Sequence, residues 1–255
     1  MRQTCVVAES TKADATESSE DIEIRSVVDL LGSVAGSQAS GRRWFRGQAN
    51  SNWGLQPGVA RNSGHLDDEV TMLKQFMRDA VNRTSLRPMG GWEWLALGQH
   101  HGLPTRLLDW SEHPLVGLFF ACETPSDGQA DGRLFELDPE GLNRSNYPSG
   151  PGLLVLGHDN HLDAYLPEAP AGPRIGPLAV TSMRYFDRVT AQVGTFTICQ
   201  LGEDLVSDPN VRSWRVPAAS KASILGELAD LNVTASTVYP DLGHLADHIK
   251  EMYRK

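Results

Sequence analysis

The sequence is poor in cysteine. Its three cysteines, Cys5, Cys122 and Cys199, are odd in number and far apart, and no Cys-x-x-Cys pair is present. This pattern argues against a disulfide framework and against a cysteine-based zinc site, and it is typical of a protein in a reducing compartment.

Long apolar runs are also missing. The longest are runs such as residues 114–122, far shorter than the roughly 20 residues that a membrane-spanning helix needs. The first residues lack the basic and apolar segments of a secretory signal, because residues 5–8 run directly into Glu9. We therefore expect a cytoplasmic protein that has no membrane partner.

Positive charge is scarce. The chain has 23 Lys and Arg residues against 32 Asp and Glu residues, which gives a net charge of -9. Such a balance opposes non-specific attraction to a phosphate backbone, so a contact with nucleic acid requires a local basic patch.

The common site motifs are absent too. The chain contains no phosphate-binding Gly-x-x-x-x-Gly-Lys-Ser/Thr loop, no dinucleotide Gly-x-Gly-x-x-Gly after a strand, no His-Glu-x-x-His and no Gly-x-Ser-x-Gly. His100, His101 and His113 with Asp109 match no closed zinc pattern, so we expect no metal. These absences exclude the frequent nucleotide-binding and hydrolase signatures.

What is present is an ordinary globular composition, with 40% hydrophobic and 22% charged residues. Residues 1–20 are rich in Ser, Thr, Ala and Glu and show no hydrophobic periodicity, so we expect a disordered leader there. Residues 21–255 are expected to form one domain.

Short helices and strands are interleaved along this domain. Hydrophobic spacing predicts helices over 22–34, 67–82, 91–101, 114–122, 221–231 and 244–253. It predicts strands over 42–48, 133–137, 178–180 and 194–199, a loop and short strand over 103–110, and an edge strand or turn over 237–240. Residues 138–177 are expected to form a long variable loop with one helical turn. The order lacks the regular alternation of a parallel sheet, which indicates an α+β fold with a mixed, mainly antiparallel sheet and packed helices.

Four ionisable residues stand inside apolar segments, where a core accepts them only if they are paired or functional: Arg46, His100, Arg106 and Asp109. We expect them to share one pocket. Two structural roles are open as well. Arg46 can form a salt bridge with Asp109, and Asp109 can cap the helix that follows it or hold Arg106.

The motifs around these residues resemble the FRG domain family. They are Trp-Phe-Arg-Gly-Gln at residues 44–48, Gln-His-His-Gly-Leu-Pro-Thr-Arg-Leu-Leu-Asp-Trp-Ser at 99–111, and the apolar segment 114–121. Residues 188–198 and the tail at 238–242 are similar to the family as well. The resemblance covers the chain from about residue 21 to its end.

A weaker resemblance is to ADP-ribosyltransferases of the arginine-serine-glutamate type. Arg46 and Gly47 are similar to the Arg-Gly of their first strand, and residues 109–121 are similar to the strand and helix that follow. This resemblance implies an ADP-ribosyltransferase-like fold, with NAD as the substrate.

The resemblance also implies roles for individual residues. Arg46, beside Gly47 and Gln48, would bind the diphosphate of NAD, and Arg106 would add a second cation. Thr105 or Ser111 would bond the nicotinamide ribose, and Trp110 would stack against a ring. His100 would bond a ribose hydroxyl or a phosphate.

The chain departs from these transferases at one position. Where they have a glutamate it has Gln192, which cannot act as a general base, so Asp109 would take over that work. The implied function is transfer of ADP-ribose to nucleic acid, protein or another acceptor, as in a toxin or phage-defence effector. The alternatives are an enzyme that processes RNA or another phosphate ester, and a nucleotide- or partner-binding module without chemistry.

Overall fold

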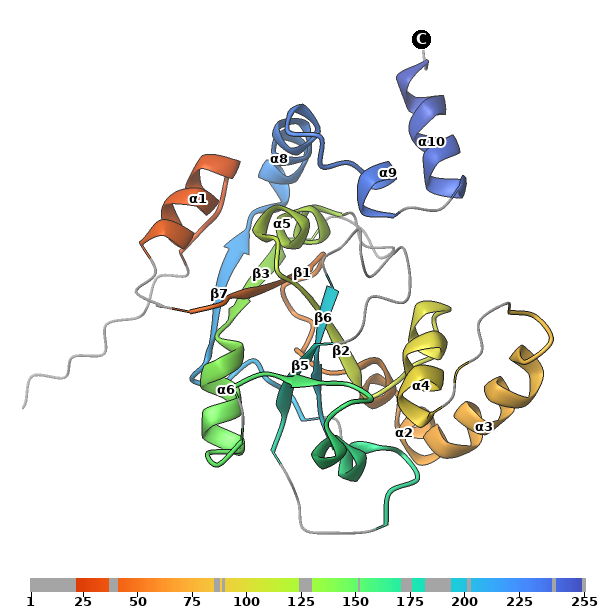
Figure 1. Cartoon of the computed structure of the whole chain (residues 1–255). Coiled ribbons are helices and arrows are strands. Elements are labelled where there is room, and N and C mark those ends of the chain that lie inside the picture. The colour runs from red at the N-terminus through yellow and green to blue at the C-terminus, as the bar shows by residue number, and fades with distance from the viewer. Residues whose placement is uncertain are drawn as a thin grey trace, which may run out of the picture.

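A mixed sheet of seven strands forms the centre of the computed structural model, with helices on both of its faces (Figure 1). The structure describes residues 22–36, 41–84, 88, 90–123, 130–150, 152–170, 176–181, 194–200, 203–239 and 242–253. The predicted leader, residues 1–20, lies outside these ranges. In the described part of the chain, no helix is long and apolar enough to cross a membrane.

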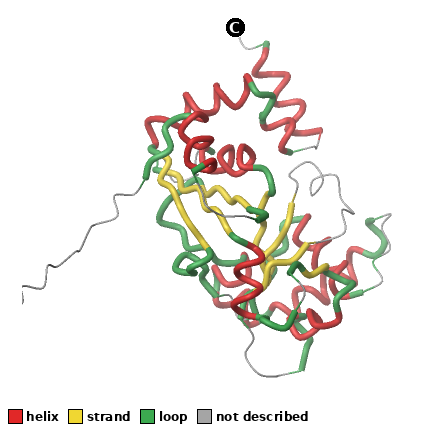
Figure 2. Tube along the Cα trace, turned by 60° about the vertical axis from the view of Figure 1, so that its left-hand side comes forward, coloured by secondary structure: helices red, strands yellow, loops and turns green. Residues whose placement is uncertain are grey.

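The strand order is β4-β5-β6-β2-β1-β3-β7. The strands are β1 (Trp44–Gln48), β2 (Leu107–Ser111), β3 (Gly132–Leu137), β4 (Leu154–Val155), β5 (Leu178–Thr181), β6 (Gly194–Ile198) and β7 (Val211–Val216). Neighbours are antiparallel except β4 and β5, which are parallel. The predicted α+β class with a mixed, mainly antiparallel sheet is therefore confirmed, and Figure 2 shows the strands between groups of helices.

The helices are α1 (Val27–Ala35), α2 (Ser63–Asp67), α3 (Glu69–Ala80), α4 (Gly91–His100), α5 (Pro114–Cys122), α6 (Pro139–Asn146), α8 (Ala218–Asp230), α9 (Ala235–Val238) and α10 (Leu242–Met252). Two short 3₁₀ helices are η1 (Gly58–Arg61) and η2 (Asn160–Tyr165). The helices α1, α5 and α8 share one hydrophobic cluster with β1, β3 and β7. A second cluster joins α3, α4 and η2 to β2, β5 and β6.

Pairing between β1 and β2 is unusually short. Along its whole length β1 pairs with β3, and β2 likewise pairs with β6. Between β1 and β2 only Phe45 and Ser111 are paired. We call this place the β1–β2 joint. It lies between the two hydrophobic clusters, in the middle of the sheet.

The helix α5 lies directly on β1 beside the joint. A Cβ atom on Gly47 would come within 2.0 Å of the Gly117 oxygen and 2.3 Å of the Ala121 nitrogen. A Cβ atom on Gly117 would in turn lie 2.9 Å from the Cβ of Phe45. The two glycines therefore let the backbones of strand and helix touch.

The main difference from the predicted fold lies in residues 138–177, which were predicted as a long loop with one helical turn. These residues contain α6, β4 and η2. The Asp138 side chain accepts from the Gly141 N–H at 2.8 Å, and Pro139 occupies the first helical turn, so standard start signals were taken for a loop. Asn143 then ties the helix to β5, donating to the Ala179 oxygen at 2.9 Å and accepting from its N–H at 2.7 Å.

Two further predictions were incomplete or wrong. The strand β7 was not predicted, although Trp214 and Val216 alternate with polar residues and pack into the first cluster. Residues 237–240, predicted as an edge strand or turn, fall partly in α9. This short helix begins with a capping box between Thr234 and Thr237.

Candidate functional site

The candidate site lies at Asp109, the exposed residue of the strand β2. This strand runs through the middle of the sheet, and four of its five residues are buried, but Asp109 is exposed. A carboxylate reaches solvent from a central strand only where the helices above it leave a gap. On one side of this position α5 packs with β1, and on the other side α4 packs with β2.

A cavity of about 190 Å³ occupies this position. Residues of β1, β2 and α5 line it: Phe45, Arg46, Gly47, Asp109, Trp110, Ser111 and Phe120. A volume of this size suits one sugar or one phosphate group, whereas pockets that enclose a whole drug-sized ligand have about 300–1,000 Å³. The described residues therefore form a subsite for part of a ligand.

Arg46 is the cation of this cavity. Its Nη1 donates to the main-chain oxygen of Asp109 at 2.6 Å. Its Nε is buried and has no hydrogen-bond partner among the described residues. Burial lowers the pKa of Arg46 to about 10, the charge of Asp109 opposes this shift, and the charge of Arg61 adds to it. The side chain thus stays charged at neutral pH and is incompletely solvated, which favours an anion beside it.

The carboxylate of Asp109 serves neither of its expected structural roles. The following helix is capped by His113, whose Nδ1 accepts from the Leu115 N–H at 3.3 Å. No salt bridge joins the Asp109 carboxylate to Arg46 or Arg106 in the described part of the chain. Instead, Asp109 Oδ1 accepts from Nε2 of Gln99 at 2.9 Å.

Arg106 was predicted to share a pocket with Arg46 and Asp109, and this prediction is wrong. Its guanidinium is buried against α3, where Nε donates to Glu69 Oε1 at 3.0 Å and Nη2 lies 2.5 Å from Glu69 Oε2. Its Nη1 donates to the main-chain oxygen of Tyr165. Because these bonds occupy its fork and it does not line the cavity, Arg106 is a structural cation and not a second phosphate ligand.

Thr105 and Gln48 are also occupied elsewhere. Thr105 is buried, and its hydroxyl donates to Gln99 Oε1 and accepts from the Leu107 N–H at 3.2 Å. The buried side chain of Gln48 donates to the Gly54 oxygen at 3.1 Å. Neither residue lines the cavity, so the predicted direct contacts with a nucleotide do not fit their positions.

Trp110, Ser111 and Gly47 do line the cavity, but each also has a structural task. The Trp110 ring is buried in a third hydrophobic cluster, and its Nε1 donates to Thr197 at 3.1 Å, so little of the ring is available for stacking. The Ser111 hydroxyl accepts from the His113 N–H at 3.0 Å. The space that Gly47 leaves is taken up by α5.

Of the other predicted catalytic residues, one stands apart from the cavity and one cannot be placed. His100 ends α4, is partly buried, and packs edge-on against His101 with ring centroids 4.8 Å apart; it does not line the cavity. Gln192 lies outside the described residues. Of the four residues expected to share one pocket, the structure brings together Arg46 and Asp109.

Three residues of the site were not predicted: Phe45, Gln99 and Phe120. All three fall within motifs that marked the resemblance, but their side chains cannot ionise, so they carry no electrostatic signal in the sequence. Phe120 forms the wall on the α5 side and packs edge-on against Tyr239, with ring centroids 5.7 Å apart.

Comparison with known families gives one match. The family model of the FRG domain matches residues 41–130, a stretch that holds both strands of the β1–β2 joint and the helix α5. No curated protein and no solved structure matches the chain. The matched stretch includes every residue that lines the cavity.

Proposed function

The chain contains an FRG domain, and we propose that its Arg46–Asp109 cavity binds NAD and transfers the ADP-ribose to an acceptor. One observation carries the proposal. Half-buried Arg46, whose buried Nε has no partner among the described residues, and the Asp109 carboxylate, which forms no salt bridge with it there, line the same small cavity. A ligand with an anionic group next to a centre that becomes positively charged fits both groups at once.

NAD has both features. Its diphosphate would accept from Nε and Nη2 of Arg46, as phosphates do from arginine forks. When the bond between the ribose carbon and nicotinamide breaks, the bonding electron pair leaves with nicotinamide and a positive charge develops on the sugar. The nearby Asp109 carboxylate would stabilise this charge electrostatically.

The acceptor completes the reaction. A lone pair on an acceptor oxygen or nitrogen would form the new bond to the ribose carbon, and Asp109 would take the proton that the acceptor loses. Because the cavity holds only part of a dinucleotide, the remainder of NAD would extend beyond its described walls. The acceptor would be a nucleic acid or a protein, in keeping with a toxin or a phage-defence effector.

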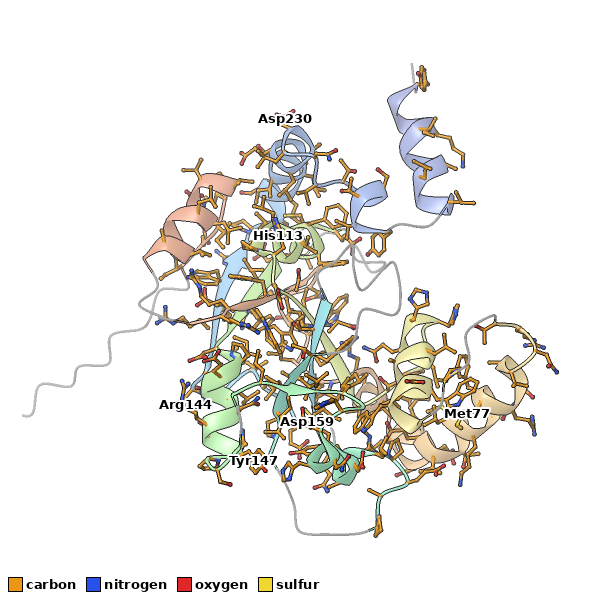
Figure 3. All side chains as sticks on the ribbon, viewed as in Figure 1. Met77, His113, Arg144, Tyr147, Asp159 and Asp230 are labelled. Carbon is orange, nitrogen blue, oxygen red and sulfur yellow. The ribbon has the colours of Figure 1, made fainter. Side chains whose placement is uncertain are left out.

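The experiment is an assay of nicotinamide release from NAD. The wild type is compared with Asp109→Asn, which keeps the shape of the side chain and removes its charge. Asp230→Asn is the matched control, since Figure 3 shows Asp230 at the outside of α8. Release that is strongly reduced but still measurable in Asp109→Asn, and retained in the control, supports the proposal. Wild-type protein that neither binds NAD nor releases nicotinamide contradicts it.

The geometry favours this function over processing of a phosphate ester. That alternative relied on His100, Arg46 and Arg106 acting together, and the cavity contains only Arg46 of the three. A binding module without chemistry is the remaining alternative. It predicts binding of NAD without release of nicotinamide, so calorimetry beside the release assay separates the two.

A further inference from the structure

Gln99 lies at the centre of a series of hydrogen bonds that runs from Thr105 to Asp109. It belongs to the last turn of α4, and its Nε2 donates to Asp109 Oδ1 at 2.9 Å and is 3.3 Å from the Leu107 oxygen. At the other end of the amide, Oε1 accepts from the Thr105 hydroxyl. The Thr105 oxygen accepts in turn from the Leu107 N–H at 3.2 Å.

The chemistry of the partners allows only one orientation of this amide. Ionised Asp109 and the Leu107 oxygen are both pure acceptors, so the end of Gln99 that faces them must be the NH₂ group. The Thr105 hydroxyl already accepts from the Leu107 N–H and has its one proton available for Gln99 Oε1. A reversed amide would put two acceptors against each other at the carboxylate.

Each link is anchored in the fold. Thr105 is buried, and its main-chain oxygen accepts from the Val59 N–H at 3.1 Å, so η1 holds it in place. Gln99 is fixed at its backbone by α4, whose Leu95 and Leu97 are buried. Asp109 is the exposed member of this series of hydrogen bonds, and without Gln99 its carboxylate would be free to rotate in solvent.

We propose that Gln99, with its amide oriented by Thr105, is the positioning residue that fixes the Asp109 carboxylate in the cavity. Its effect on catalysis rests on the proposed function, whereas its effect on the carboxylate does not. With Oδ1 held by Gln99, Oδ2 is the oxygen that remains for the substrate. Arg46 meanwhile binds the main-chain oxygen of the same residue, so both ends of Asp109 are held.

The first arm of the test needs no ligand. In ¹⁵N-labelled full-length protein, the Gln99 side-chain amide signals are those that disappear in Gln99→Leu. We expect them to shift on acidification in the wild type, because they report the charge of Asp109, and to show no such shift in Asp109→Asn. They should also change in Thr105→Val and return in Thr105→Ser. Signals that are the same in wild type and Asp109→Asn at every pH would overturn the inference.

The second arm uses nicotinamide release from NAD in a double-mutant cycle. We expect Gln99→Leu to lower kcat on the order of 100-fold with little change in KM, since misplacing a catalytic group has effects of that size. In the Asp109→Asn background the same substitution should have less than about a twofold effect. An equal loss of kcat in both backgrounds would mean that Gln99 does not act through Asp109.

Controls separate folding from positioning. Gln75→Leu, at an exposed position of α3, is the matched substitution, and thermal unfolding is measured for every variant. Thr105→Ser keeps the hydroxyl and should retain the wild-type kcat. If the wild type releases no nicotinamide, the proposed function fails, and the amide signals alone decide whether Gln99 positions Asp109.

Discussion

Arg46 donates from Nη1 to the main-chain oxygen of Asp109 at 2.6 Å, and the two side chains form no salt bridge. The guanidinium is therefore held by a main-chain oxygen, and the charge of Asp109 acts on it only at a distance, without a direct ion pair. The carboxylate is likewise left available to a ligand. A simple structural ion pair would have neutralised both groups.

The free energy of unfolding should depend strongly on the charge of Arg106 and little on the charge of Arg46. We expect Arg106→Met to lower the free energy of unfolding by about 3–5 kcal/mol, because it leaves Glu69 buried without a cation. Arg46→Met should change it by less than about 1 kcal/mol or raise it, since a poorly solvated charge is removed. Urea denaturation measures both. Equal destabilisation would make Arg46 a structural residue.

Arg46→Lys tests the shape of the cation. Lysine keeps the charge but lacks the planar fork, so binding of NAD should weaken by about 1.5–3 kcal/mol. Isothermal titration calorimetry measures the change. Unaltered affinity would mean that Arg46 does not bind the dinucleotide through two nitrogens.

Gly47→Ala should disrupt the contact of α5 with β1. Its new Cβ would fall within 2.0 Å of the Gly117 oxygen, and backbone atoms cannot move aside cheaply. We expect a loss of more than about 3 kcal/mol in the free energy of unfolding. The matched control is Gly226→Ala in α8, where no atom lies within 4 Å and alanine should stabilise the helix by about 0.5–1 kcal/mol. A tolerated Gly47→Ala would contradict the described packing.

The two buried thiols should resist alkylation. Burial raises the pKa of both Cys122 and Cys199 from 9.0 to about 12, so almost no thiolate exists at pH 8. Iodoacetamide followed by peptide mass spectrometry should find them unmodified in the folded protein. Between pH 9 and about 12 the unfolded chain loses these protons first, so stability should fall as the pH rises. Rapid labelling at pH 8 would contradict this environment.

Gln192→Glu tests the departure from the transferases. The residue lies outside the described part of the chain, and the prediction comes from the sequence resemblance. A carboxylate at this position should raise or maintain nicotinamide release, provided that the cavity tolerates a further negative charge. A fall in release in a variant that still binds NAD would argue against a transferase-like role for this position.

Much of the fold was predictable because its elements have regular apolar spacing. The helix α5 was predicted with its observed bounds, since Pro114 opens an unbroken apolar segment. By contrast, α6 has few apolar residues and depends on the contact of Asn143 with β5, which no local pattern reveals. Tertiary contacts override weak local preference in such segments.

The site was predictable in part for a similar reason. That Arg46 and Asp109 lie close together was expected from the sequence, because the motifs that contain them both resemble the FRG domain. Arg106 was misassigned because its partner, Glu69, is far away in the sequence and stands in a helix whose other residues gave no sign of it. A charged residue in an apolar segment indicates that a partner exists, but the sequence does not tell which one.

The single residue pair at the β1–β2 joint has a mechanical consequence. A sheet transmits load through its ladders, and here one half, β4-β5-β6-β2, is joined to the other, β1-β3-β7, by Phe45 and Ser111. The Arg46 side chain bridges the same line by its bond to Asp109. A ligand that binds Arg46 on β1 and Asp109 on β2 would connect the two halves of the sheet where they share the fewest backbone contacts. It would therefore make the whole domain more rigid.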